Sequence, residues 1–179
     1  MFLHFRHVAP PLLLAAAACP VGGGTGSANQ NLSATVSAIA TVTVAGTTNL
    51  TPGANPFDPF TGNATLNYRG RTTPTGGGTI TLEVTSDFQP SGGPSAANNT
   101  LQYTCSGATL GSACSGTQTG STTIQTPVLT LPASACTGGG GVCSSQDLNS
   151  VNVNFTLTDD PSYATGTFTA KVTFTISAT

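Results

Sequence analysis

Apolar and polar residues alternate with a period of two along most of this chain, and no stretch follows the 3.6-residue period of a helix. In residues 79–85, isoleucine, leucine and valine alternate with threonine and glutamate. Because successive side chains of a strand point to opposite faces, this pattern predicts a strand with one buried face. The same alternation predicts strands in residues 151–157 and 168–176.

Weaker alternation predicts four or five further strands, in residues 32–44, 64–69, 100–105 and 124–131. Pro127 lies within the last of these and indicates a bulge or an edge strand, because proline cannot donate a ladder hydrogen bond. Segments rich in glycine, proline and asparagine separate the strands and predict turns. Seven or eight short strands divided by turns predict an all-β fold, an immunoglobulin-like antiparallel β-sandwich.

The N-terminal residues have the pattern of an export signal. Arg6 precedes an apolar run over residues 8–18, which is too short to span a bilayer. We expect residues 1–28 to be cleaved after Ala28, leaving a single domain over residues 29–179. The alternative is cleavage before Cys19, which would produce a lipid-anchored form. With either cleavage site, we expect export to the periplasm, the cell surface or the extracellular space.

Four of the five cysteines follow the predicted signal, at Cys105, Cys114, Cys136 and Cys143. They lie in a stretch rich in glycine and serine, residues 105–143, which we expect to be an insertion in the sandwich. An exported chain meets an oxidising compartment, so these residues are expected to form disulfides. Four cysteines allow three pairings, of which we favour the sequential one, and their spacing does not match a zinc site.

Charged residues make up only 6% of the chain, and the formal net charge is −2. Such a chain has no basic stripe for nucleic-acid phosphates and no polybasic segment for an anionic membrane. We therefore expect that the protein has no nucleic-acid partner and no membrane-spanning segment. Strand edges without charges pair readily with other chains, so self-association is expected.

Catalysis is limited by the side chains that remain after signal cleavage. The two histidines, His4 and His7, lie in the predicted signal, so the mature chain offers no Ser-His-Asp arrangement and no histidine-ligated metal. Glu83 and Asp87 could in principle form a glycosidase pair, but a surface pair is the simpler interpretation. We predict a protein that is not an enzyme and has no catalytic, cofactor or metal site.

Three short motifs indicate a family. Leu32-Ser-Ala-Thr-Val-Ser-Ala opens the mature chain, Phe57-Asp-Pro-Phe-Thr-Gly forms an early loop, and Gly166-Thr-Phe-Thr-Ala-Lys-Val-Thr-Phe-Thr-Ile-Ser closes the chain. Together they resemble the secreted bacterial spore coat protein U domain and its relatives among the chaperone–usher pilins. The resemblance covers both ends of the chain and not its cysteine-rich middle. Such domains commonly have an early cysteine in the first strand. This chain lacks it and has Val36, Ala38 and Val42 in that region.

The resemblance implies an incomplete sandwich that accepts an extended strand from a neighbouring subunit. The candidate donor is residues 32–44, and its apolar positions are Leu32, Val36, Ala38, Val42 and Val44. The alternative is that this segment is the first strand of its own domain. The implied partners are other copies of the chain, other surface subunits and a periplasmic chaperone. We expect a structural or adhesive surface protein, such as a fibre or coat subunit, or alternatively a monomeric module that binds a glycan or host surface.

Overall fold

The computed structural model describes residues 29–136, 143 and 148–179, so the predicted signal peptide lies outside the described residues. The described part forms nine β-strands and one 3₁₀ turn, η1. In chain order these are β1 (Ile39–Val44), β2 (Phe60–Arg71), β3 (Gly78–Gln89), η1 (Ala96–Asn98), β4 (Leu101–Ser106), β5 (Ser112–Ala113), β6 (Gln118–Thr119), β7 (Thr126–Leu131), β8 (Asn149–Leu157) and β9 (Thr169–Ala178).

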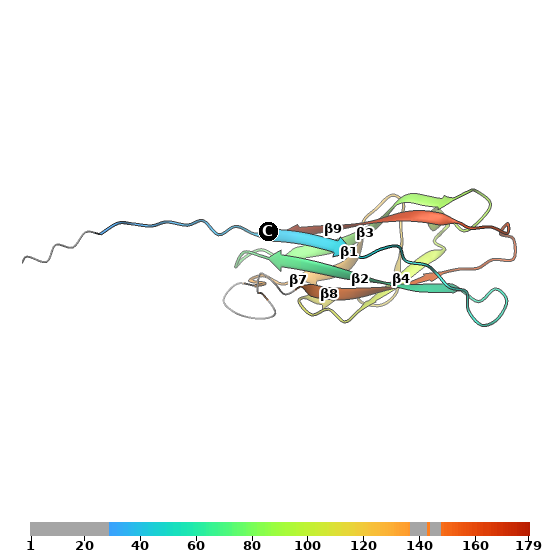
Figure 1. Ribbon diagram of the computed structural model, residues 1–179, viewed down its shortest axis with the longest axis horizontal. Coiled ribbons are helices and arrows are strands. Elements are labelled where there is room, and N and C mark those ends of the chain that lie inside the picture. The colour runs from blue at the N-terminus through green and yellow to red at the C-terminus, as the bar shows by residue number, and fades with distance from the viewer. Residues whose placement is uncertain (1–28, 137–142, 144–147) are drawn as a thin grey trace, which may run out of the picture. The chain divides into compact units, whose positions relative to one another are not determined.

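The strands form two antiparallel sheets that pack face to face, which is the β-sandwich that the alternation predicts (Figure 1). One sheet has five strands in the order β1-β2-β8-β4-β6, and the other has four in the order β5-β7-β3-β9. The longest strands, β2, β3, β8 and β9, carry most of the pairing. β1 and β9 are edge strands, one in each sheet, and they lie along the same side of the sandwich.

The core follows directly from the alternation along the central strands. On β8, every second residue from Asn149 to Leu157 is buried, and the residues between them are partly exposed. β2 and β3 bury their alternate residues in the same way. Burying a side chain of valine, leucine or phenylalanine contributes roughly 1.5–3 kcal/mol. Most outward positions are threonine, serine and asparagine, and some of them bond to each other across strands, as Asn63 does to Asn154 at 2.8 Å.

Each of the seven stretches with alternation contains a strand, but the total is nine rather than seven or eight. The two additional strands, β5 and β6, have two residues each. Two residues cannot display a period of two, so the sequence pattern could not reveal them. The irregularity expected at Pro127 is present, because the register between β3 and β7 shifts where Ile80 pairs with Leu129 and Thr81 pairs with Pro127.

The expectation that residues 105–143 form an insertion was wrong. This stretch supplies β5, β6 and β7, and β7 lies between β5 and β3 in the four-stranded sheet. Val128, Leu129 and Leu131 of β7 are buried in the core. β7 is the strand that the alternation predicted in residues 124–131, and the expectation of an insertion was wrong because it did not place this strand in the core.

Residues Thr35–Thr179 form one compact unit, and residues 29–34 fall outside it. Within the described part of the chain, no helix has the length and apolar character needed to cross a membrane.

Candidate functional site

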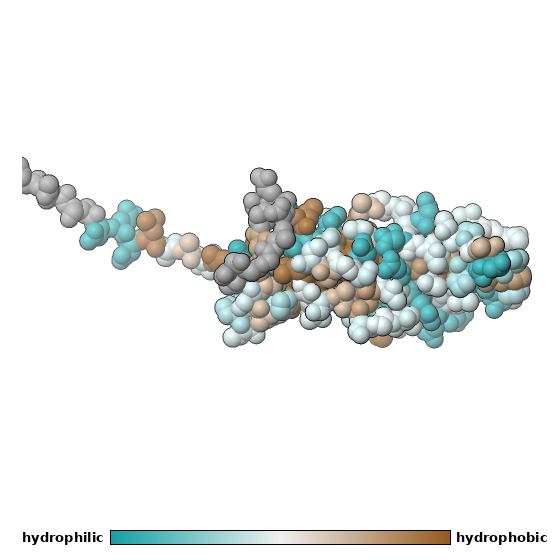
Figure 2. Space-filling view, turned by 90° about the horizontal axis from the view of Figure 1, so that it is seen from below, coloured by the Kyte–Doolittle hydropathy of each residue, from teal (hydrophilic) through white to brown (hydrophobic). Residues whose placement is uncertain are grey.

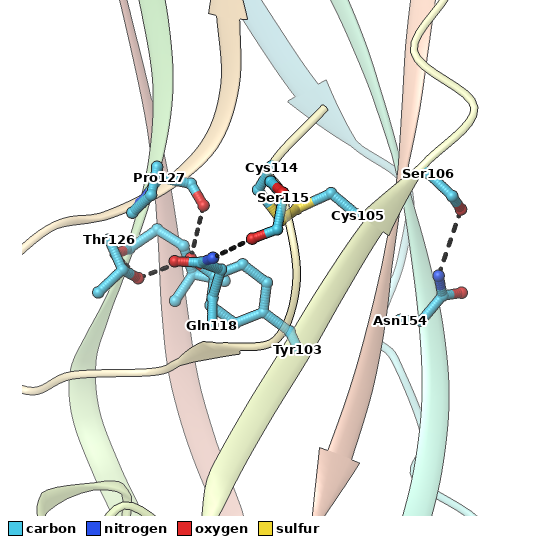
Figure 3. The surroundings of a disulfide bond; sticks show 10 residues. Tyr103, Cys105, Ser106, Cys114, Ser115, Gln118, Thr126, Pro127 and Asn154 are labelled. Carbon is cyan, nitrogen blue, oxygen red and sulfur yellow. Dashed lines mark hydrogen bonds between the residues drawn. A yellow bond between two sulfur atoms is a disulfide. The ribbon is translucent and has the colours of Figure 1, made fainter. Parts of the chain in front are cut away.

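The two long sides of the sandwich differ, and one of them is closed by a covalent link. Cys105 on β4 belongs to the five-stranded sheet, while Cys114 directly follows β5 of the four-stranded sheet. Their disulfide, with an Sγ–Sγ distance of 2.05 Å, therefore joins the two sheets (Figure 3). The backbone N–H of Cys114 also donates to the carbonyl of Val128 on β7, at 2.8 Å. This side ends in the short edge strands β5 and β6.

Tyr103 strengthens the same side from within. Its hydroxyl lies 2.7 Å from Oγ1 of Thr126 and 2.9 Å from the carbonyl oxygen of Pro127, so a residue of β4 bonds to β7 in the opposite sheet (Figure 3). Burial raises the pKa of Tyr103, although the bond to Thr126 acts in the opposite direction, and the hydroxyl keeps its proton at neutral pH. A disulfide and a buried hydrogen-bonded tyrosine thus hold the two sheets together here.

The second disulfide joins Cys136 to Cys143, with their Cα atoms 5.2 Å apart. The structure therefore has the sequential pairing that we expected. Cys136 follows β7, and the turn before it is attached to the end of β2. Thr72 donates its hydroxyl to the carbonyl of Pro132 and accepts the backbone N–H of Ala135, both at 2.8 Å.

We call the opposite long side, along β1 and β9, the open side, because no disulfide among the described residues links the two sheets there, although β1 and β9 lie close to each other. Here the edge strands are long, with six residues in β1 and ten in β9. Every second side chain of β9 points inward, yet none is fully buried, and the inward residues of β1 are also only partly covered. The two sheets therefore do not cover each other completely along β1 and β9.

The free edge of β9 can be located from the hydrogen-bond register. Thr179 N–H donates to the carbonyl of Gly77 at 2.8 Å, whereas Val84 N–H donates away from β9, to Ser121. Residue pairs along two antiparallel strands alternate between hydrogen-bonded and non-hydrogen-bonded. Val172 lies opposite Val84, whose N–H points away from β9, so this pair is non-hydrogen-bonded. The N–H and C=O of Val172 therefore point away from β3. The same holds for Phe174, two residues along. The backbone of β9 thus offers hydrogen-bonding groups to the open side.

A groove of about 950 Å³ lies beyond the end of β1 on this side. Its walls come mainly from the start of β2, the end of β8 and the start of β9, together with the loop before β2 and the loop between β8 and β9. Seven of the nine aromatic residues in the described part of the chain line it. They are Phe57, Phe60, Phe88, Phe155, Tyr163, Phe168 and Phe174. The inward side chains of β9 thus continue into an aromatic-lined groove, and none of the described strands fills it.

Acidic residues mark one end of the groove. Asp159 and Asp160 follow β8 and line the groove together with Tyr163. Hydrogen bonds from Ser162 lower the pKa of Asp160, since its carboxylate accepts the backbone N–H of Ser162 at 2.8 Å. Burial has the largest effect on the pKa of Tyr163 and raises it. The negative charges of Asp160 and, to a smaller extent, Asp159 raise it further. The negative charge of this loop therefore reaches the wall of the groove.

The candidate donor segment divides into two parts. Val42 and Val44 lie in β1, which pairs with β2 of the same chain, from Ile39 opposite Arg71 to Val44 opposite Leu66. Ala38 lies just before β1 and is half-buried. Leu32 and Val36 lie outside any strand and are 92% and 72% exposed. The first strand of the domain is thus β1, and residues 29–38 are an uncharged segment with apolar residues at alternate positions.

The two carboxylates considered for catalysis do not form a pair. Glu83 and Asp87 lie four residues apart on β3, which at about 3.3 Å per residue is about 13 Å. Glycosidase carboxylates are about 5–9.5 Å apart. Asp87 instead accepts hydrogen bonds from Ser95 Oγ and from the backbone N–H groups of Phe88, Ala96 and Ala97. Its carboxylate fixes the start of η1.

No protein-family model matches this chain, and no curated protein matches it either. The aromatic groove is the feature that sequence reasoning missed, because aromatic residues were too few to suggest a binding surface. A usable signal was their distribution, since six of the seven groove aromatics fall in residues 57–60 and 155–174. Those two stretches meet where Phe60 pairs with Leu157.

Proposed function

We propose that this chain is a non-enzymatic, secreted structural subunit of a surface fibre or coat, and that copies assemble when a strand of one copy pairs with the free edge of β9 in another. The observation that carries the proposal is the open side of the sandwich, where a ten-residue edge strand borders an aromatic-lined groove. A bare edge beside an apolar groove is the arrangement that an added strand completes.

The edge strands on this side lack the features that usually prevent pairing. Natural edge strands are blunted by charges, prolines, bulges or short length. β1 carries no charge and β9 carries only Lys171. Figure 2 shows that much of the visible surface of the domain is pale, the colour of near-neutral hydropathy, so little charge opposes contact between copies. The other side has only two-residue edges and a disulfide.

Residues 29–38 have the properties of the added strand. Leu32, Ala34, Val36 and Ala38 would point to one face and Ser33, Thr35 and Ser37 to the other. Burying Leu32 and Val36 would contribute roughly 1.5–3 kcal/mol each. We infer that these residues of one copy enter the groove of the next, while Ile39–Val44 stays in its own sheet.

Other features agree with a surface role. The two disulfides are typical of an oxidising, exported environment. The resemblance to spore coat protein U and the chaperone–usher pilins supports the same role and suggests a periplasmic chaperone as a transient partner. The Asp87 carboxylate is engaged by four hydrogen bonds, which argues against its part in a glycosidase pair.

The test is the assembled mass of the secreted, signal-cleaved protein by light scattering. Wild type is expected to form large polymers. Leu32→Asp combined with Val36→Asp should abolish them, because two carboxylates would enter an apolar groove without partners. The matched control is Ser33→Asp combined with Thr35→Asp, which places the same charges on the opposite face and should leave assembly intact.

A second pair of variants tests the accepting edge. Val172→Pro removes an N–H that points away from β3, so the fold should persist while assembly stops. Thr173→Pro removes an N–H that points toward β3 and should destabilise the domain itself. If the Val172→Pro protein assembles like wild type, or if wild type is a stable monomer, the proposal is wrong. A monomer would direct attention to the groove as a glycan or host-surface binding site.

A further inference from the structure

The groove combines aromatic rings and carboxylates at one end, which we call the acidic end. Phe57 and Phe60 come from the chain around the start of β2, and Asp159, Asp160 and Tyr163 come from the loop after β8. These two stretches meet because the start of β2 pairs with the end of β8. Rings and carboxylates therefore border the same space.

Several of the rings are accessible from the groove. Phe57 is 57% exposed, and Phe60 and Tyr163 are only partly buried. Phe168 and Phe174 also line the groove and are partly buried. The face of an aromatic ring carries partial negative charge and attracts a cation that lies within about 6 Å of the ring centroid. The rings therefore suit a positive group as well as an apolar one.

No arginine of the described residues neutralises the carboxylates of Asp159 and Asp160. The two arginines in this part of the chain, Arg69 and Arg71, lie near the end of β2, whereas the groove lies at its start. The stretch from the start of β2 to Arg69 spans about 30 Å at about 3.3 Å per residue. Salt screens exposed charges beyond about 8–10 Å at physiological ionic strength. These arginines therefore do not compensate the charge of the acidic end.

Lys171 also borders the groove, but its side chain lies on the other face of β9. Its neighbours in the strand, Ala170 and Val172, pack against the core. Because successive side chains of a strand point to opposite faces, Lys171 points to the outer face of the four-stranded sheet, and it is exposed. The charge at the acidic end of the groove is thus negative.

Tyr163 shows that this charge acts on a ring of the groove wall. Burial raises the pKa of Tyr163 most, and the negative charges of Asp160 and Asp159 raise it further. The hydroxyl therefore keeps its proton at neutral pH, and the neutral ring offers its face to a cation.

The size and charge of the groove together limit the class of ligand. Its volume of about 950 Å³ is near the top of the range for small-molecule pockets, about 300–1,000 Å³. A bare metal ion would leave most of this space empty, and the described residues contain no cluster of three or more metal-ligating side chains. A neutral sugar could stack on the rings but would not compensate the carboxylates. An organic cation with an apolar body matches both features.

We infer that the groove binds an organic cation, with a quaternary ammonium group beside Asp159, Asp160 and Tyr163 and an apolar body along the phenylalanines. A quaternary ammonium group has no N–H to donate, so rings and opposite charge are the groups that hold it. The inference goes beyond the proposed function, because it assigns a small-molecule ligand to the groove and does not depend on assembly. A bound cation and a strand from a neighbouring copy would compete for the same space.

The test is an NMR titration of the isotope-labelled, signal-cleaved protein carrying Leu32→Asp and Val36→Asp. In this protein the groove stays free of a neighbouring strand whether or not strand pairing occurs in wild type. Choline should bind saturably and shift the amides of the loop after β8, and hexyltrimethylammonium should bind more tightly because its chain packs on the phenylalanines. Absence of saturable binding by either cation would contradict the inference.

An uncharged analogue separates charge from shape. Replacing the trimethylammonium group of choline by a tert-butyl group keeps the size and removes the charge. This alcohol should bind about tenfold or more weakly than choline, because it lacks the attraction to the rings and carboxylates. Equal binding of the two compounds, or tighter binding of the neutral sugar maltose, would show that the groove does not select a cation.

Variants in the same protein test the two carboxylates. Asp159→Asn and Asp160→Asn, singly and together, remove charge and keep the shape, and Asn can still accept the N–H of Ser162. The double variant should bind choline about tenfold or more weakly and bind the uncharged analogue unchanged. The matched control is Glu83→Gln, which removes a carboxylate from the outer face of β3 and should leave choline binding within about twofold.

The outcomes separate this inference from the proposed function. If the double variant binds choline like its parent, or if Glu83→Gln weakens binding equally, the assignment of the cation to the acidic end is wrong and strand pairing stands. If choline binds as expected while wild type is a stable monomer, the cation site stands and strand pairing is wrong.

Discussion

At the scale of single residues, polar side chains in this domain fasten loops to strands. Asp87 is the clearest case, because its carboxylate accepts four hydrogen bonds at the start of η1. Burial alone would raise the pKa of Asp87, but the bonds from Ser95, Ala96, Phe88 and Ala97 outweigh it and hold the pKa below 3.8. The charged form is thus favoured in the folded state.

We predict that Asp87→Ala lowers the free energy of unfolding by about 0.5–2 kcal/mol, the range for losing a helix cap. The matched control is Glu83→Ala on the same strand, whose side chain lies on the outer face and which should change stability by less than about 0.5 kcal/mol. Urea unfolding measures both. Equal losses in the two variants would contradict a capping role for Asp87.

The stabilisation by Asp87 also depends on pH. Its pKa is lower folded than unfolded, so the folded state binds the proton more weakly. The contribution is therefore fully present above about pH 5 and is lost as the pH falls through the folded pKa. The stability difference between wild type and Asp87→Ala should shrink between about pH 5 and pH 2, and a difference independent of pH would refute the assignment.

At the scale of elements, the sandwich has one fastened side and one open side. β4 and β7 belong to different sheets, yet the Cys105–Cys114 disulfide and the Tyr103 hydroxyl join them. β1 and β9 have no such link between sheets in the described part of the chain. The fastened side allows β5 and β6 to remain as edges of only two residues.

Replacing Cys105 and Cys114 together by serine should therefore cost about 2–4 kcal/mol in the free energy of unfolding. The closed loop spans nine residues, and loop-closure entropy alone accounts for about 2.5–3 kcal/mol. Urea unfolding of the non-reduced proteins gives the value. A loss below about 1 kcal/mol would mean that Tyr103 and the short strands hold this side without the disulfide.

At the scale of the whole molecule, the open side and the groove together support the proposed mode of assembly. The groove lies at the end of the sandwich where Phe60 pairs with Leu157, and the candidate strand leaves from the opposite end, where Ile39 pairs with Arg71. Each copy would thus offer an acceptor at one end and a donor at the other. Such a subunit would grow into a polymer of one kind of chain, because the chain itself carries both the donor and the acceptor.

Hydrogen exchange can detect this assembly residue by residue. In an unassembled copy, the amides of Val172 and Phe174 should exchange faster than that of Thr173, because only the latter points toward β3. In the polymer the first two should slow by at least about tenfold, while Thr173 changes little. Unchanged exchange at Val172 and Phe174 after polymer formation would show that β9 is not the accepting edge.

The sequence by itself determined the fold class and the seven longer strands, and it favoured the sequential pairing of the cysteines, which the structure then showed. These features depend on local alternation and short-range spacing, as in the strand around Ile80. Only the tertiary structure decided which edges are open, how β7 enters the core, and that Phe57, Phe168 and their aromatic neighbours share one groove. Strand order and the meeting of distant loops create those features, and neither is encoded in the periodicity of a single segment.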